Sequence, residues 1–108
     1  MITIDIYRDD KGLINEYKVV GHADSVKDGF DPVCALISLT TQAPIIGLEE
    51  HLKRKLSLVI KQEEGILEVK LQNAADDLTE AILATMVLTL ADLEKKYPEI
   101  LHTKEHRR

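Results

Sequence analysis

Four segments of the chain have the pattern of β-strands. The four segments are 2–8, 13–20, 56–61 and 66–71. Alternation of apolar and polar residues is strict in the first, where Ile2, Ile4 and Ile6 form one apolar face, and Asn15 interrupts it in the second. A turn containing glycine separates the first two segments, and another separates the last two. The pattern therefore predicts two β-hairpins, each with one buried face.

Two longer segments have the three- and four-residue apolar spacing of helices. The first is predicted from Pro32 to about His51, with Asp31 as its N-cap and Pro32 at the first helical position. Pro44 lacks a backbone N–H, so it is expected to kink this helix or to split it in two. His51 falls near its C-terminal end, far from the first turn.

The second predicted helix follows Asp76 or Asp77, either of which suits its N-cap, and runs to about Lys96 before Pro98 stops it. Its apolar stripe is expected to consist of Leu78, Ala81, Ile82, Thr85, Leu88 and Leu93. Other apolar residues widen the stripe beyond one face. A wide apolar surface fits either a central core helix or a helix with a dimer face.

These elements predict an α/β fold, a two-layer sandwich of order ββαββα with a mostly antiparallel sheet and both helices on one face. At 108 residues the chain is expected to form a single domain, residues 1–98. Residues 99–108 read as a charged C-terminal tail, solvated and poorly ordered. His102 and His106 lie four apart in this tail, but no third ligand is evident, so no metal site and no cofactor are expected.

Composition narrows the classes of function. The chain is 44% hydrophobic and 31% charged, as in soluble globular proteins, and its net charge of −5 argues against a nucleic-acid-binding surface. A single cysteine excludes an intrachain disulfide and suits a reducing compartment, so a cytoplasmic location is expected. We expect neither a signal peptide nor a membrane partner, because no apolar run approaches the roughly 20 residues of a membrane span.

The candidate chemistry is concentrated where the first hairpin leads into the first helix. Cys34 falls at the third helical position, where unpaired backbone N–H groups and the helix dipole favour the negative charge of a thiolate. His22 follows the end of the second strand, twelve positions earlier. A thiolate nucleophile beside an imidazole is the requirement of a cysteine protease. The alternative is that Cys34 is a small buried apolar residue.

Further residues in this region have candidate supporting roles. Ser38 lies one turn after Cys34 on the same helix face, where it would donate to the sulfur or bind substrate. Asp31 would cap the helix, orient His22, or do both. The backbone N–H groups around Val33 to Ala35 are candidate oxyanion donors.

The loop between His22 and Asp31 contains glycine at Gly29, and Gly21 precedes it. This loop is either an ordinary solvated connection or a lid that closes over bound peptide. Phe30, at its base, would anchor the loop in the core or line a substrate pocket.

The residues of this region resemble those of a known family. The matching blocks are Gly21-His22-Ala23, Gly29-Phe30-Asp31, Val33-Cys34-Ala35 and Ser38. They are similar to the signature of the bacterial ribosomal-processing cysteine proteases, the Prp or YsxB-like family. The resemblance implies His22 as general base and Cys34 as nucleophile, with Asp31 and Ser38 in supporting roles.

The resemblance also implies a substrate and an assembly. Members of the family are cysteine endopeptidases that remove an N-terminal extension from a protein of the large ribosomal subunit, with apolar or aromatic residues before the cleaved bond. The family leans to homodimers. Two residues depart from the family pattern: Leu36 replaces a small alanine and would narrow the space near the nucleophile, and Pro32 replaces an apolar residue.

Two other functions use the same residues. A thiol redox sensor would rely on Cys34, but the chain has no second cysteine to resolve an oxidised thiol. A non-catalytic ribosome-assembly or interaction module would carry an unreactive thiol. Dependence of activity on His22 separates the protease from the redox sensor.

Overall fold

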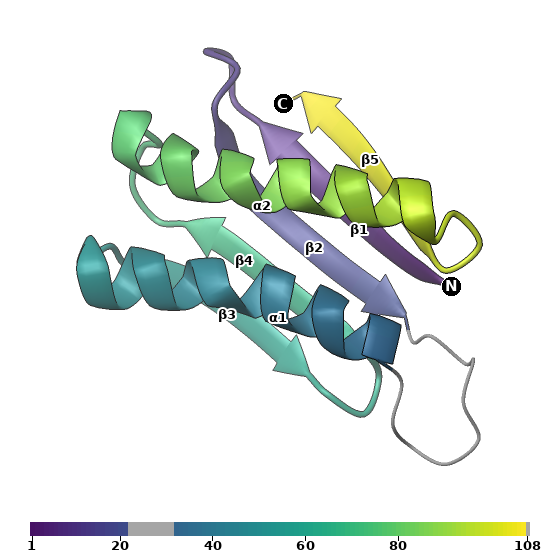
Figure 1. Ribbon diagram of the computed structural model, residues 1–108. Helices are drawn as coiled ribbons and strands as arrows, with labels where there is room; N and C mark the ends of the chain where they lie inside the picture. The colour runs from purple at the N-terminus through teal and green to yellow at the C-terminus, as the bar shows by residue number, and fades with distance from the viewer. Residues whose placement is uncertain (22–31, 108) are drawn as a thin grey trace.

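The computed structural model describes residues 1–21 and 32–107, which form a sheet of five strands with two helices on one of its faces (Figure 1). The elements in chain order are β1 (Ile2–Arg8), β2 (Ile14–Gly21), α1 (Pro32–Ile46), the short π-helix η1 (Gly47–His51), β3 (Leu56–Lys61), β4 (Ile66–Leu71), α2 (Asp77–Lys96) and β5 (Leu101–Arg107). The predicted α/β sandwich with both helices on one face is confirmed. The predicted order ββαββα lacks the last strand.

The strands lie in the order β3-β4-β2-β1-β5, and every neighbouring pair is antiparallel except β1 with β5. The expectation of a poorly ordered tail is wrong, because β5 pairs with β1 along its whole length. Leu101 is buried, and Arg8 binds Glu105 at 2.8 Å. Main-chain pairing and ion pairs hold this strand in place. It lacks the apolar periodicity that marks the other four strands, and for that reason its sequence does not predict a strand.

A β-bulge explains why Asn15 interrupts the alternation of β2. Tyr7 of β1 pairs with Glu16 and Arg8 pairs with Ile14, so Asn15 is the extra residue. The bulge changes the phase of the strand, and both Ile14 and Tyr17 are buried as a result. The hairpin predicted for this part of the chain is confirmed.

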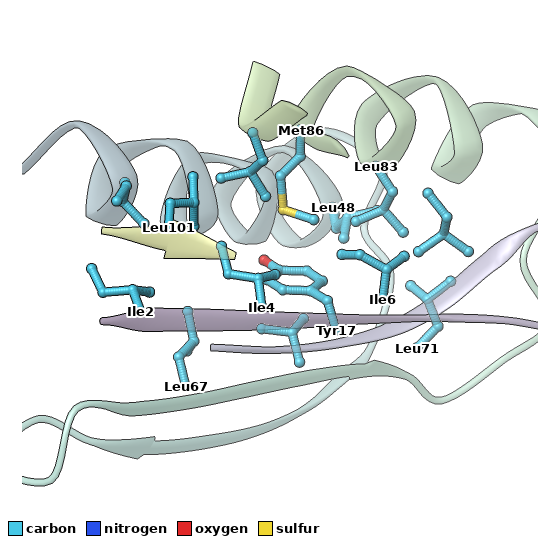
Figure 2. Close-up of a cluster of buried hydrophobic side chains, with 14 residues drawn as sticks. Ile2, Ile4, Ile6, Tyr17, Leu48, Leu67, Leu71, Leu83, Met86 and Leu101 are labelled. Carbon is cyan, nitrogen blue, oxygen red and sulfur yellow. The ribbon is translucent and has the colours of Figure 1, made fainter. Parts of the chain in front are cut away.

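The core lies between the sheet and the two helices and is almost wholly aliphatic (Figure 2). Its buried apolar residues are Ile2, Ile4, Ile6, Ile14, Tyr17, Ile37, Leu48, Leu67, Val69, Leu71, Leu83, Met86, Leu90 and Leu101. Tyr17 is the one aromatic residue in this buried cluster, and its hydroxyl donates a hydrogen bond of 2.6 Å to the carbonyl oxygen of Thr41 in α1. Burial raises the pKa of the Tyr17 hydroxyl above its ordinary value, so the group stays protonated as a donor.

Helix α1 packs on the sheet through Ile37, Thr41 and Pro44, and the stripe continues to Leu48 in η1. Pro44 does not split the helix in two, which was one of the two predicted outcomes. The chain remains helical to His51, and the wider π-helical turn follows, where Leu52 N–H bonds Gly47 O.

Helix α2 begins as the sequence predicts. The Asp76 side chain accepts hydrogen bonds from Leu78 N and Thr79 N, while the Thr79 hydroxyl bonds the Asp76 backbone N–H in a capping box. The hydrogen bond from the Thr79 backbone, together with Arg54, lowers the pKa of the Asp76 carboxyl.

The predicted apolar stripe of α2 is only partly right, because Ile82 and Leu93 pack against the core but do not form its centre. The buried residues are Thr79, Leu83, Met86 and Leu90. Leu78 and Leu88, which the prediction placed in the stripe, are exposed. Apolar residues surround much of this helix, so spacing alone does not select the face that meets the sheet.

One helical stretch among the described residues, Pro32–His51, is long and apolar enough by length and composition to cross a membrane. The expectation that no apolar run approaches that length is therefore wrong. A core helix of a soluble protein passes the same test, and this helix packs on the sheet through one face. Leu39 and Ile46 on its exposed surface contribute to its apolar character.

The Tyr17 hydrogen bond generates a prediction about stability. Replacing Tyr17 by Phe removes the donor and leaves the buried Thr41 carbonyl without this bond, so the free energy of unfolding should fall by about 1–2 kcal/mol. Urea denaturation followed by circular dichroism measures the change. A loss below about 0.3 kcal/mol would show that this bond does not hold α1 to β2.

Candidate active site

Strand β2 ends at a glycine that no other residue can replace without strain. Gly21 has a φ of +115°, and a Cβ built on it would overlap the carbonyl oxygen of Met1. Its N–H donates to Gly65 O at 2.9 Å, which fixes this end of the strand against the β3–β4 turn. Gly21 therefore sets where the chain leaves the sheet toward His22.

Cys34 is the third residue of α1, as predicted, and Pro32 is the first. Cys34 is the only cysteine in the sequence and forms no disulfide, and its side chain is half-buried against the hydrophobic core. The first turn of α1 contains no acidic residue, so no carboxylate within it offsets the positive end of the helix dipole. Val33 is half-buried beside Cys34, and Ala35 is exposed.

The direction that Cys34 faces follows from the contacts of α1. A Cβ on Gly47 would lie 3.3 Å from Ile82 Cδ1, so that flank of the helix faces α2. Thirteen residues at about 100° each place Cys34 about 140° from Gly47 around the axis. Cys34 therefore lies on the flank turned away from α2, over the β4–β3 side of the sheet. Ser38 follows about 40° from it and is also half-buried.

Leu36 does not narrow the space near the nucleophile. It lies about 160° from Cys34 around α1, and its side chain is exposed. This departure from the family pattern therefore leaves the Cys34 flank unchanged. Pro32 begins the helix, where its missing N–H removes no intrahelical bond.

Several predicted site residues lie outside the described residues. They are His22, Gly29, Phe30 and Asp31. Their roles, including the pairing of His22 with Cys34, stay predictions. The C-terminal end of β2 and the first turn of α1 lie at the same end of the sheet (Figure 1), which is where a dyad of these two residues requires them.

The histidines of β5 form no metal centre within the described part of the chain, where no group of three or more candidate ligands occurs. His106 Nε2 lies 2.7 Å from Asp5 Oδ1, and its ring stacks on Tyr7 with centroids 4.8 Å apart. These contacts tie β5 to β1.

The fold and the half-buried thiol at a helix start define a candidate cysteine hydrolase. A family profile described as "Cysteine protease Prp" matches residues 1–102. The chain belongs to this family of cysteine proteases, as the sequence predicts. A curated relative, the ribosomal processing cysteine protease Prp of Staphylococcus aureus (strain Mu50), is 28% identical over 111 residues, covering 92% of this chain and 93% of the relative.

Solved structures show the same fold. The essential ribosomal processing protease Prp from S. aureus, in complex with a covalently linked product peptide, has a TM-score of 0.90 at 25% identity and covers 98% of this chain and 100% of its own. The same protein in complex with a substrate peptide has a TM-score of 0.87 at 24% identity over 98% and 100% of the two chains. A Streptococcus mutans protein matches with a TM-score of 0.87 at 24% identity, covering 100% of this chain and 96% of its own.

The geometry of Gly21 generates a prediction. Gly21→Ala should destabilise the protein by about 2–4 kcal/mol, because it combines a disfavoured φ with an overlap against Met1. Thermal unfolding measures the effect. The control is Gly12→Ala, where φ is +84° but the nearest atom to an added Cβ is the side-chain Nη1 of Arg107 at 3.7 Å. Equal losses in both variants would contradict the role of the Met1 contact.

Proposed function

We propose that this protein is a ribosomal-processing cysteine endopeptidase that removes the N-terminal extension of a large-subunit ribosomal protein. One observation carries the proposal: the single cysteine of the chain occupies the first turn of α1 in a fold whose relatives include a ribosomal processing protease with a peptide bound. The net charge of −5 suits a basic substrate, since opposite charges steer encounter.

The mechanism uses a dyad. His22 takes the proton of the Cys34 thiol, and the thiolate sulfur attacks the scissile carbonyl carbon. Backbone N–H groups at the start of α1, from Val33 to Ala35, donate to the oxyanion that forms. The C–N bond then breaks, His22 protonates the leaving amine, and a thioester remains. Water activated by His22 hydrolyses the thioester and restores the thiol.

Asp31 and Ser38 support the dyad in this proposal. Asp31 directly precedes α1, where its carboxylate caps the helix or orients His22. Ser38 lies on the Cys34 flank of α1, one turn further on, where its hydroxyl donates to the sulfur or binds substrate.

Substitution of the dyad tests the proposal. Cys34→Ala and His22→Ala should each lower the rate of cleavage by at least about a thousandfold, because each removes a reacting group. Mass spectrometry of the extended ribosomal precursor, incubated with each variant, measures the product. Ser57→Ala, at an exposed position of β3, is the control and should cleave normally.

The contrary outcomes separate an error in the nucleophile from each of the two rival functions. Processing by Cys34→Ala would contradict the assignment of the nucleophile. A thiol that oxidises reversibly and is unaffected by His22→Ala, without any cleavage by the wild type, would identify a redox sensor instead. Absence of both cleavage and thiol reactivity at neutral pH would identify a non-catalytic interaction module.

We further propose that the protein is a cytoplasmic homodimer. Its only cysteine forms no disulfide, which suits a reducing compartment. The outer surfaces of both helices expose large apolar side chains, and monomers rarely expose many together. These are Leu36, Leu39 and Ile46 of α1 and Leu78 and Leu88 of α2.

The homodimer is tested at the helix surface. Leu39 and Leu88 are 68% and 71% exposed, so a charge at either should leave the monomer folded. Leu39→Glu and Leu88→Glu should each shift the mass in sedimentation equilibrium from dimer to monomer. The control Ser57→Glu, at an exposed position on the opposite face of the sheet where its pairing partner is Lys70, should stay dimeric. A wild type that sediments as a monomer at all concentrations would contradict the proposal.

A further inference from the structure

Strand β3 lies at an edge of the sheet, and among the described strands it pairs with β4 alone. One hydrogen bond shows which residues of this strand turn their main-chain groups toward β4. Gln72 N donates to Lys55 O at 3.1 Å, so the Lys55 carbonyl turns toward β4. Paired and outward-turned residues alternate along a strand of an antiparallel pair. Leu58 and Ile60 therefore turn their N–H and C=O groups toward the open edge.

The side chains of the same two residues lie on the helix side of the sheet. Leu58 pairs with Val69 and Ile60 with Leu67, and both partners are buried in the core under the helices. Yet Leu58 is 37% exposed and Ile60 is 63% exposed. The edge thus combines unpaired main-chain groups with exposed apolar side chains in one short strand.

This edge lies on the same side and at the same end of the fold as the nucleophile. Cys34 lies on the flank of α1 turned away from α2, which is the flank on the β3 side. Lys61 of β3 pairs with Ile66, which pairs in turn with Val20 next to Gly21. The Ile60 end of β3 is therefore level with the end of β2 that leads to His22.

We propose that the substrate peptide binds as an added strand along the outer edge of β3. Its main chain bonds the outward groups of Leu58 and Ile60, and its apolar side chains pack on these two residues beneath the Cys34 flank of α1. This mode places an extended peptide beside the sulfur with its carbonyls in a regular array. The inference rests on the proposed function and adds where and how the substrate binds.

The charges of β3 favour a peptide over a second copy of this chain. The strand has no acidic residue, and Lys55 and Lys61 flank its apolar centre. Antiparallel pairing of two copies about Leu58 would set Lys55 of each copy opposite Lys61 of the other, and like charges directly opposite destabilise a pair of strands. An apolar, uncharged peptide segment meets no such repulsion.

Adjacent residues of β3 supply a matched test. Ile60→Lys places a charge on the proposed binding face, whereas Val59→Lys places the same charge on the other face, where Glu68 is its partner in the pairing. Val59 is 39% exposed, so both variants should fold. Steady-state cleavage of the extended ribosomal precursor gives KM and kcat for each, and sedimentation gives the oligomeric state.

The expected result is a KM raised about tenfold or more by Ile60→Lys, with kcat less affected and with Val59→Lys equal to the wild type. Equal KM values for the two variants would overturn the inference while leaving the proposed function intact. A change of oligomeric state in Ile60→Lys alone would also overturn it, because the edge would then belong to a second copy. Absence of cleavage by the wild type would overturn the proposed function and the inference together.

Discussion

The arrangement of this protein depends on how α1 is held against the sheet. Its buried residues Ile37, Thr41 and Pro44 face the core, and the hydroxyl of Tyr17 bonds the Thr41 carbonyl from below. A helix held by both a buried stripe and a directional hydrogen bond has little freedom to turn about its axis. Its rotation decides which flank carries Cys34.

This constraint links two parts of the chain that are far apart in sequence. Tyr17 lies in β2, five residues before His22, and Thr41 lies in α1, seven residues after Cys34. The elements that lead to the two proposed reacting groups are therefore joined inside the core, and Cys34 lies half-buried against it. The stability of the core supports the position of the thiol.

The parts of the fold with regular periodicity could be predicted from sequence. The first strand, the second hairpin and the capped start of α2 match the structure because local patterns determine them: Ile2, Ile4 and Ile6 alternate, and Asp76 caps its helix. The position of Cys34 in the first turn of α1 followed from Pro32 in the same way.

The remaining features depend on contacts that a local pattern does not contain. β5 pairs with β1 across about a hundred residues of chain and contributes only Leu101 to the core. The buried face of α2 is chosen by the sheet beneath it, not by the helix's own spacing. The strand order is needed to know that β3 has an open edge. The sequence contains one related signal, the three consecutive apolar residues from Leu58 to Ile60, but it does not say that they lie at an edge.

The most direct measurement of this account is amide hydrogen exchange, followed by NMR, of Cys34→Ala with and without the N-terminal peptide of the ribosomal precursor. If α1 turns Cys34 toward β3 and the peptide adds to that edge, the amides of Leu58 and Ile60 should exchange quickly in the free protein and be slowed on binding. The Val59 amide, turned toward β4, should stay slow in both states. Unchanged exchange at Leu58 and Ile60 in a saturated complex would contradict the account.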